Sequence, residues 1–191
     1  VSIFIGVIFS LSSTSILGNI IAGIVLTYMR SFSNGDSIKV NDIVGDVVEK
    51  NLFTIKLKTS KNEIISIPNS SMLSANILNY TNSIKKDKLI ITTTVMIGYD
   101  IAWQKVYECL INAALSTQNI LDNPTPFVLQ TKLDNFYVSY QVNAYVTTEK
   151  GMGSIYSELH QNIQDEFNKN GIEMVSPNFN NIKDFSKAKE L

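Results

Sequence analysis

The sequence has little of what a metal site, a disulfide framework or a common active site needs. Its 191 residues include one cysteine, Cys109, and one histidine, His160. One cysteine cannot form a disulfide within a chain, and a Cys/His metal site needs several such ligands. The sequence also lacks a phosphate-binding loop and a dinucleotide-binding glycine motif. We therefore expect no metal and no cofactor.

Neither of these two residues has a sequence context that indicates catalysis. No arrangement of serine, cysteine or carboxylate singles out His160 as a general base. Cys109 precedes Leu110 in an apolar stretch with helical spacing, which is typical of a core residue. We predict no catalytic residues.

Excess positive charge is also missing. The chain carries 16 basic and 17 acidic residues, for a net charge of −1. Residues 1–86 carry 8 basic and 5 acidic side chains, and residues 87–191 carry 8 and 12. Nucleic-acid-binding proteins are usually more basic than this, so the balance predicts no nucleic-acid partner.

Charge is absent altogether from the first 29 residues. Val1–Met29 contains 18 apolar residues, three glycines and eight uncharged polar residues, and the first charge is Arg30. About 20 predominantly apolar residues are enough to cross a bilayer as a helix. A signal peptide fits less well, because there is no basic n-region and no small-residue cleavage site. A buried helix of a globular protein is the remaining alternative.

Polar residues interrupt this segment in the middle. The run Ser12–Ser15 is followed by Gly18 and Asn19. Serine and threonine side chains bond back to a helix and bend it, so we expect a kinked helix. Arg30 favours a cytoplasmic position for the chain after it, by the positive-inside tendency.

Small residues recur every four positions near the start, at Ser2, Gly6 and Ser10. This spacing forms a stripe that lets a neighbouring helix approach closely. Val7 and Leu11 form an adjacent apolar stripe. The alternative is a lipid-facing anchor whose small residues are incidental.

The rest of the chain predicts two further domains. Short strands at about 8–12-residue spacing are typical of a small barrel or sandwich, and we place them at 37–40, 44–50, 54–59, 64–68 and 77–81, with a helical turn opening at 68–71. A second pattern comes after them, with strands at 89–97, 127–133, 137–146 and 172–175 and helices at 101–116 and 154–168. The order strand-helix-strand-strand-helix-strand is the ferredoxin-like unit.

Two stretches resemble the small-conductance mechanosensitive channel (MscS-like) family. Residues 18–30, followed by Gly35 and Asp36, resemble the end of the family's pore-lining third helix and the start of its cytoplasmic part. Residues 65–70 together with 76–80 resemble the family's Ile-Pro-Asn signature in the β domain. Residues 126–129 and 156–160 resemble stretches of one branch of the family.

The resemblance implies a membrane helix plus α+β fold. A kinked, pore-lining transmembrane helix would occupy residues 1–32, a small Sm-like β barrel 33–86, a ferredoxin-like α+β domain 87–177 and a polar tail 178–191. Further helices would precede Val1. The partners implied are the lipid bilayer, six further copies in a homoheptamer, and permeating ions and small solutes. The location implied is the cell (inner) membrane, with the body after Arg30 cytoplasmic.

The resemblance also assigns roles within the pore helix. The family's two leucine rings, which form its hydrophobic seal, fall on Val7 and Leu11. The stripe of Ser2, Gly6 and Ser10 would pack neighbouring pore helices together. Val7 is smaller than leucine, so Leu11 is expected to form the tighter ring.

The same resemblance assigns the bend and the contact with the β domain. The family's kink glycine falls on Ser15 and its second hinge glycine on Gly23. Because Ser15 is not glycine, Gly18 is a further candidate for the kink. Asn19 matches an asparagine beside the kink and is expected to touch the β domain near Ser70.

Three functions remain open from the sequence. The first is a mechanosensitive ion channel subunit, opened by membrane tension to release ions and small solutes on hypo-osmotic shock. The second is a membrane-tethered binding module whose barrel binds RNA or a regulatory ligand, for which Lys56, Lys58 and Lys61 are the basic cluster. The third is a membrane enzyme, which lacks candidate catalytic residues.

Overall fold

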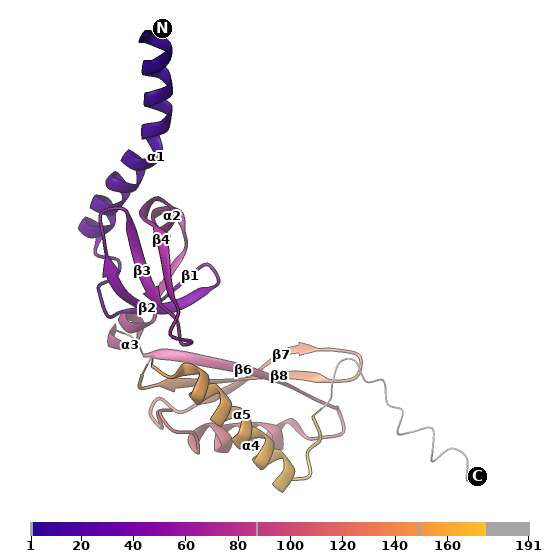
Figure 1. Cartoon of the computed structure of the whole chain (residues 1–191). Coiled ribbons are helices and arrows are strands. Elements are labelled where there is room, and N and C mark those ends of the chain that lie inside the picture. Colours follow the sequence, from indigo (N-terminus) through magenta and orange to yellow (C-terminus); the bar gives the residue numbers. More distant parts are fainter. Residues whose placement is uncertain (1, 87, 149, 175–191) are drawn as a thin grey trace. The chain divides into compact units, whose positions relative to one another are not determined.

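The computed structural model describes residues 2–86, 88–148 and 150–174, and the side chains of residues 2–15, 85 and 86 are outside this description. The chain divides into two compact units, residues 1–87 and 88–191. Figure 1 shows the first unit in colours from indigo to magenta and the second from pink to yellow.

One long helix opens the first unit. Helix α1 runs from Ser2 to Met29 without interruption, and Figure 1 shows its ribbon changing direction partway along. It ends where Arg30 takes a left-handed conformation with φ of 49°. Within the described part of the chain, no helix has the length and apolar character needed to cross a membrane. The pore helix predicted over 1–32 is therefore not confirmed.

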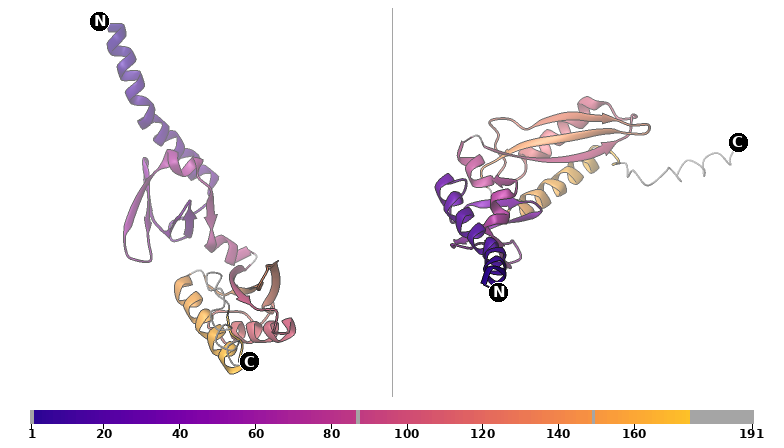
Figure 2. Two further views of the ribbon diagram at one scale, coloured as in Figure 1. Left: turned by 90° about the vertical axis from the view of Figure 1, so that its right-hand side faces the viewer. Right: turned by 90° about the horizontal axis from the view of Figure 1, so that it is seen from above.

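A five-stranded antiparallel sheet forms the rest of the first unit. Its strand order is β4-β3-β2-β1-β5, and the curved strands are seen in Figures 1 and 2. Among the described strands no pairing joins the edges β4 and β5 into a closed barrel. The strands are β1 (Ser37–Val40), β2 (Ile43–Lys50), β3 (Thr54–Lys58), β4 (Ile64–Pro68) and β5 (Ile77–Asn79).

The end of α1 and its connector contribute to the core of this sheet. Leu26 and Phe32 are buried together with alternate residues of the strands, which have the period of two expected for a half-buried sheet. The other buried members are Ile38, Val40, Val47, Ile55, Leu57 and Met72. The sheet and the end of α1 therefore share one core.

Two short helices interrupt the first unit. Helix α2 (Asn69–Ser74) stands where a helical turn was expected, whereas α3 (Tyr80–Lys86) was not predicted. The strand expected at 77–81 ends at Asn79, because the Asn79 side chain accepts a 2.9 Å hydrogen bond from the Asn82 N–H. An asparagine in this position caps a helix and ends the strand.

The second unit is a three-stranded antiparallel sheet with two helices. The strand order is β6-β8-β7, and Figures 1 and 2 show α4 and α5 side by side on one face. Its elements are β6 (Leu89–Ile97), α4 (Trp103–Leu115), β7 (Phe127–Leu133), β8 (Val138–Val146) and α5 (Met152–Lys169). The predicted hairpin and both predicted helices occur within two residues of their expected bounds.

The fourth strand expected at 172–175 is wrong for the described residues. Ile172 still donates its N–H to the Phe167 carbonyl at 2.9 Å, and Gly171 is left-handed with φ of 65°, so the end of α5 takes up this segment. Met174 then forms an isolated antiparallel bridge with Ile97 of β6. Val175 and the predicted tail 178–191 lie outside the described residues. The α+β order of the unit is otherwise as expected.

Candidate functional site

The second half of α1 is joined to the β domain at Asn69. This side chain is 1% exposed. Its amide nitrogen lies 2.7 Å from the Leu52 carbonyl oxygen, 3.1 Å from that of Asn51 and 3.4 Å from that of Asn19. One NH₂ group therefore connects α1, the β2–β3 connection and the start of α2.

The other half of the Asn69 amide is unpaired. Its Oδ1 atom is buried and has no hydrogen-bond partner among the described residues. A buried acceptor without a donor typically costs about 1–3 kcal/mol. Asn69 is held in place by its NH₂ group and by its backbone N–H, which donates to the Phe53 carbonyl at 2.9 Å.

Gly23 allows α1 to come this close. A Cβ atom at this position would lie 2.5 Å from Asn69 Nδ2 and 2.7 Å from the Leu52 carbonyl oxygen. A Cβ at Gly18, by contrast, would meet nothing within 4 Å. The absence of a side chain is therefore required by packing at Gly23 and not at Gly18. Whether either residue acts as a hinge stays a prediction.

Asn19 and Ser70, expected to lie near each other, are in direct contact. The Ser70 backbone N–H donates to Asn19 Oδ1 at 3.0 Å. The bond uses the backbone of residue 70, so the geometry does not depend on a serine there. The structure brings these two residues together with Gly23 around Asn69, and their part in coupling stays a prediction.

The other predicted site residues cannot be placed by their side chains. The backbones of Ser2, Gly6, Val7, Ser10, Leu11 and Ser15 belong to α1. Their side chains lie outside the described residues. The predicted pore constriction, packing stripe and first kink therefore remain predictions.

The connector that leaves α1 is held by side chains from two strands. Asn79 Nδ2 donates to the Ser31 carbonyl at 3.1 Å, and Lys50 Nζ donates to the Phe32 carbonyl at 3.0 Å. Asp36 Oδ2 accepts from Asn79 Nδ2 and from the Ser33 N–H, both at 2.9 Å. Three consecutive connector residues, 31 to 33, thus have a backbone group bound by a side chain.

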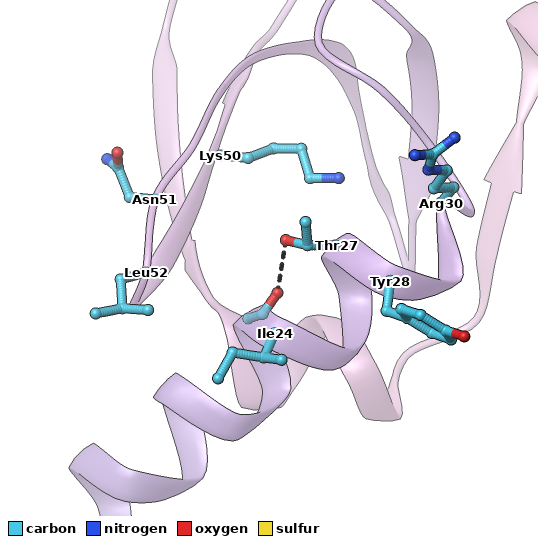
Figure 3. A pocket seen from close by; sticks show the side chains of 8 residues that line it. Ile24, Thr27, Tyr28, Arg30, Lys50, Asn51 and Leu52 are labelled. Atoms are coloured by element: carbon cyan, nitrogen blue, oxygen red, sulfur yellow. Dashed lines mark hydrogen bonds between the residues drawn. The ribbon is translucent and has the colours of Figure 1, made fainter.

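A pocket of about 730 Å³ lies beside this connector. Figure 3 shows Lys50 extending across it from β2, on the side of the pocket opposite the α1 residues Ile24 and Tyr28. Thr27 Oγ1 donates to the Gly23 carbonyl at 2.8 Å, so this hydroxyl is satisfied within the helix. The lining residues are Gly23, Ile24, Thr27, Tyr28, Arg30, Lys50, Asn51 and Leu52.

The pocket has two cationic side chains and no acidic one in its lining. Metal sites for hard cations need carboxylate or carbonyl oxygens gathered around one point. Among residues 2–86, 88–148 and 150–174, no group of three or more His, Cys, Asp or Glu could hold a metal ion. The lining therefore suits contact with anionic and apolar groups.

Three residues of this site were missed from the sequence. Asn69 and Asn79 lie within the two motif stretches, 65–70 and 76–80, so a signal for them existed. Lys50 is a single lysine at the end of a strand, and nothing in its sequence context distinguishes it from other lysines. Its partner, the Phe32 carbonyl, is a backbone group that no pattern of side chains can reveal.

The structure places both residues for which the sequence predicts no catalytic role. Cys109 is 2% exposed in the core of the second unit, and burial raises the pKa of its thiol. This confirms Cys109 as a core residue. His160 is exposed on α5, with Nε2 2.9 Å from Thr93 Oγ1.

Comparison with known proteins adds to this geometry. Residues 15–82 match the family model described as the mechanosensitive ion channel β-domain, and residues 91–174 match that of the mechanosensitive ion channel MscS C-terminal domain. The chain belongs to the MscS-like family of mechanosensitive channels. The two MscS matches correspond to the two compact units, which divide at residue 87.

Individual relatives agree with this assignment. The chain is 25% identical over 182 residues to the large-conductance mechanosensitive channel MscMJLR of Methanocaldococcus jannaschii, covering 91% of this chain and 49% of that protein. It is 24% identical over 170 residues to the small-conductance mechanosensitive channel of Helicobacter pylori, covering 89% and 61%. It is 24% identical over 164 residues to the miniconductance channel MscM of Escherichia coli, covering 86% and 15%. The chain thus spans less than two thirds of each relative.

Solved structures show the MscS-like fold. The crystal structure of Helicobacter pylori MscS in its closed state matches with a TM-score of 0.78 at 22% identity, over 93% of this chain and 69% of that one. The cryo-electron microscopy structure of wild-type MSL1 of Arabidopsis thaliana matches with a TM-score of 0.67 at 20% identity, over 90% and 60%. The β domain followed by an α+β domain is therefore the MscS arrangement.

Proposed function

We propose that this chain is the pore-lining and cytoplasmic part of a mechanosensitive channel subunit, opened by membrane tension. The observation that carries the proposal is the junction at Asn69, where an uncharged apolar helix is fixed to a family β domain. Gly23, Asn69 and Leu52 meet there too closely for any side chain on residue 23. A helix attached in this way can exchange force with the β domain.

Rings of Val7 and Leu11 from neighbouring subunits would form the closed constriction. Apolar side chains in a narrow pore hold water poorly, so such a ring gates by dewetting. Ser2, Gly6 and Ser10 would let neighbouring helices pack closely and slide. Leu11 carries the tighter ring because its side chain is larger than that of Val7.

Tension opens the channel by shifting a population between two states. Whichever state has the larger area in the membrane plane is favoured as tension rises, with tension acting as a ligand does. Opening would release ions and small solutes during hypo-osmotic swelling. No bond is made or broken in this activity, in agreement with a family of channels rather than enzymes.

Asn19 and Ser70 would couple the pore helix to the β domain through their 3.0 Å contact. Bending would occur at Ser15 or Gly18; a Cβ at Gly18 would meet nothing within 4 Å, while Gly23 is held against Asn69. The part of α1 before the bend would then move, while the part around Gly23 stays fixed to the β domain. A helix bends most readily where small or serine residues interrupt it.

The proposed assembly is a homoheptamer in the cell inner membrane, with the body after Arg30 in the cytoplasm. The family membership and the oligomeric channels among its members support a ring of identical subunits. Native mass spectrometry of the full-length protein would be expected to give seven copies.

Patch-clamp recording of the full-length protein in liposomes tests the function. Suction should evoke stepwise currents that are absent from protein-free liposomes. Silence at tensions up to membrane rupture, from protein shown to be folded and assembled, would reject the proposal. The alternative of RNA binding by the β domain is less well supported, because Lys56 of its basic cluster is paired with Glu49 at 2.7 Å.

A further inference from the structure

The connector after α1 has backbone carbonyls that are bound by side chains of the β domain. Loops normally run over the surface with their backbone groups in water. Here the carbonyls of Ser31 and Phe32 accept from Asn79 of β5 and Lys50 of β2, at 3.1 and 3.0 Å. Strands β2 and β5, which lie on either side of β1, therefore each bind one of two successive connector residues through a side chain.

Lys50 holds Phe32 by its ring as well as by its backbone. Its ammonium nitrogen lies 4.7 Å from the centre of the Phe32 ring. Phe32 is 2% exposed and belongs to the core of the first unit. An ammonium over an aromatic face is attracted by the ring, more strongly where water is excluded. One side chain thus fixes both the backbone and the ring of the same residue.

Lys50 has this role without a direct carboxylate partner. In the part of the chain that the structure describes, its ammonium forms no ion pair within 4.0 Å. Burial lowers the pKa of Lys50, and the charge of Asp36 acts in the opposite direction. The ammonium is therefore partly removed from water, and its contacts are with a carbonyl and a ring. Figure 3 shows the side chain extended across the pocket.

We propose that Lys50 is a positioning residue for gating, which fixes the end of α1 to strand β2. The proposal rests on the proposed channel function. We call the contacts of Lys50 with the Phe32 carbonyl and the Phe32 ring the clamp. While the clamp is formed, a displacement of α1 is transmitted to the β domain and is not absorbed by movement of the connector. A contact that differs in strength between two states shifts the equilibrium between them. Loss of the clamp therefore changes the tension at which the states are equally populated.

Three variants of the full-length protein separate this role from general effects. Lys50→Met keeps the length of the side chain and removes the charge and the donors. Lys50→Arg restores a cation that can donate to the carbonyl and stack on the ring. Lys58→Met makes the same change at an exposed lysine of β3, in the same sheet.

Amide hydrogen exchange in detergent gives the first readout. In Lys50→Met, exchange of the connector amides, including those of Ser33, Gly35 and Asp36, should rise about fivefold, the factor that corresponds to one lost net hydrogen bond. Lys50→Arg should return most of the protection, and Lys58→Met should match the wild type. Unchanged exchange in Lys50→Met would overturn the clamp, whether or not the protein is a channel.

The tension for half-maximal current gives the second readout. Lys50→Met should shift it in either direction relative to wild type and Lys58→Met, with Lys50→Arg closer to wild type. Faster exchange without a shift would overturn the gating role and leave Lys50 a structural residue. A wild type without current would reject the channel function instead, while the exchange measurement would still decide the clamp.

Discussion

Asn69 and residue 23 lie so close that only glycine fits. A Cβ on residue 23 would lie 2.5 Å from Asn69 Nδ2, well inside van der Waals contact. The amide cannot easily retreat, because its NH₂ group lies within hydrogen-bonding distance of three carbonyls. The distance between α1 and the β domain is therefore set by this pair.

The first prediction depends on that distance. Gly23→Ala should destabilise the protein by about 1–3 kcal/mol, the usual effect of overpacking, although alanine favours the helix itself. Gly18→Ala is the matched control, because its Cβ would meet nothing within 4 Å and should stabilise by up to about 1 kcal/mol. Thermal unfolding of both variants in detergent measures the difference. Equal midpoints would contradict the close packing.

The second prediction concerns the NH₂ group of Asn69. Asn69→Asp replaces it with an oxygen facing the carbonyls of Asn19, Asn51 and Leu52, so a loss of about 3 kcal/mol or more is expected from a buried unpaired charge. The loss should shrink at low pH, where the carboxyl is neutral. Denaturant unfolding across pH measures it. Ser70→Ala keeps the backbone donor to Asn19 and should have little effect.

The third prediction addresses the proposed constriction. Leu11→Ser should allow water into the closed pore, so current should appear at lower tension than in wild type and cells should grow poorly when it is expressed. Leu17→Ser makes the same change at an exposed position of α1 and should leave the tension unchanged. Patch clamp and growth curves measure both. Identical thresholds for the two variants would place the constriction elsewhere.

The fourth prediction uses the buried thiol of Cys109. Burial raises its pKa in the folded state above the ordinary value of 9.0, so the unfolded thiol ionises first and the folded state binds more protons. Stability from this group is fully present below pH 9.0 and is lost as pH rises through the folded pKa. The stability difference between wild type and Cys109→Ala should therefore fall at alkaline pH, above the ordinary thiol pKa, as urea unfolding would measure. A difference that stays constant throughout the alkaline range would contradict it.

Strands and helices with a clear period were predictable. The alternation of Ile55 and Leu57 with Lys56 and Lys58 places β3, and the helical spacing of Ile155, Leu159, Ile163 and Phe167 places α5, all four of which are buried. Helix α3 was missed because it is short and its start is marked only by the cap at Asn79. The strand expected at 172–175 does not form among the described residues, because the Ile172 N–H bonds back to the Phe167 carbonyl of α5 and Gly171 turns the chain in a left-handed conformation.

Periodicity predicted most of the elements, although it missed α3 and wrongly placed a strand at 172–175. The two motif stretches predicted the family and singled out Asn19, Gly23 and Ser70, because periodicity and motif spacing are local properties of a chain. That Asn69 is the centre of the junction and that Lys50 holds Phe32 are seen in the folded structure alone. Both depend on distances between segments 17 to 50 residues apart and on backbone carbonyls that every residue has. Such contacts leave no pattern in the sequence, since any residue could have supplied the acceptor.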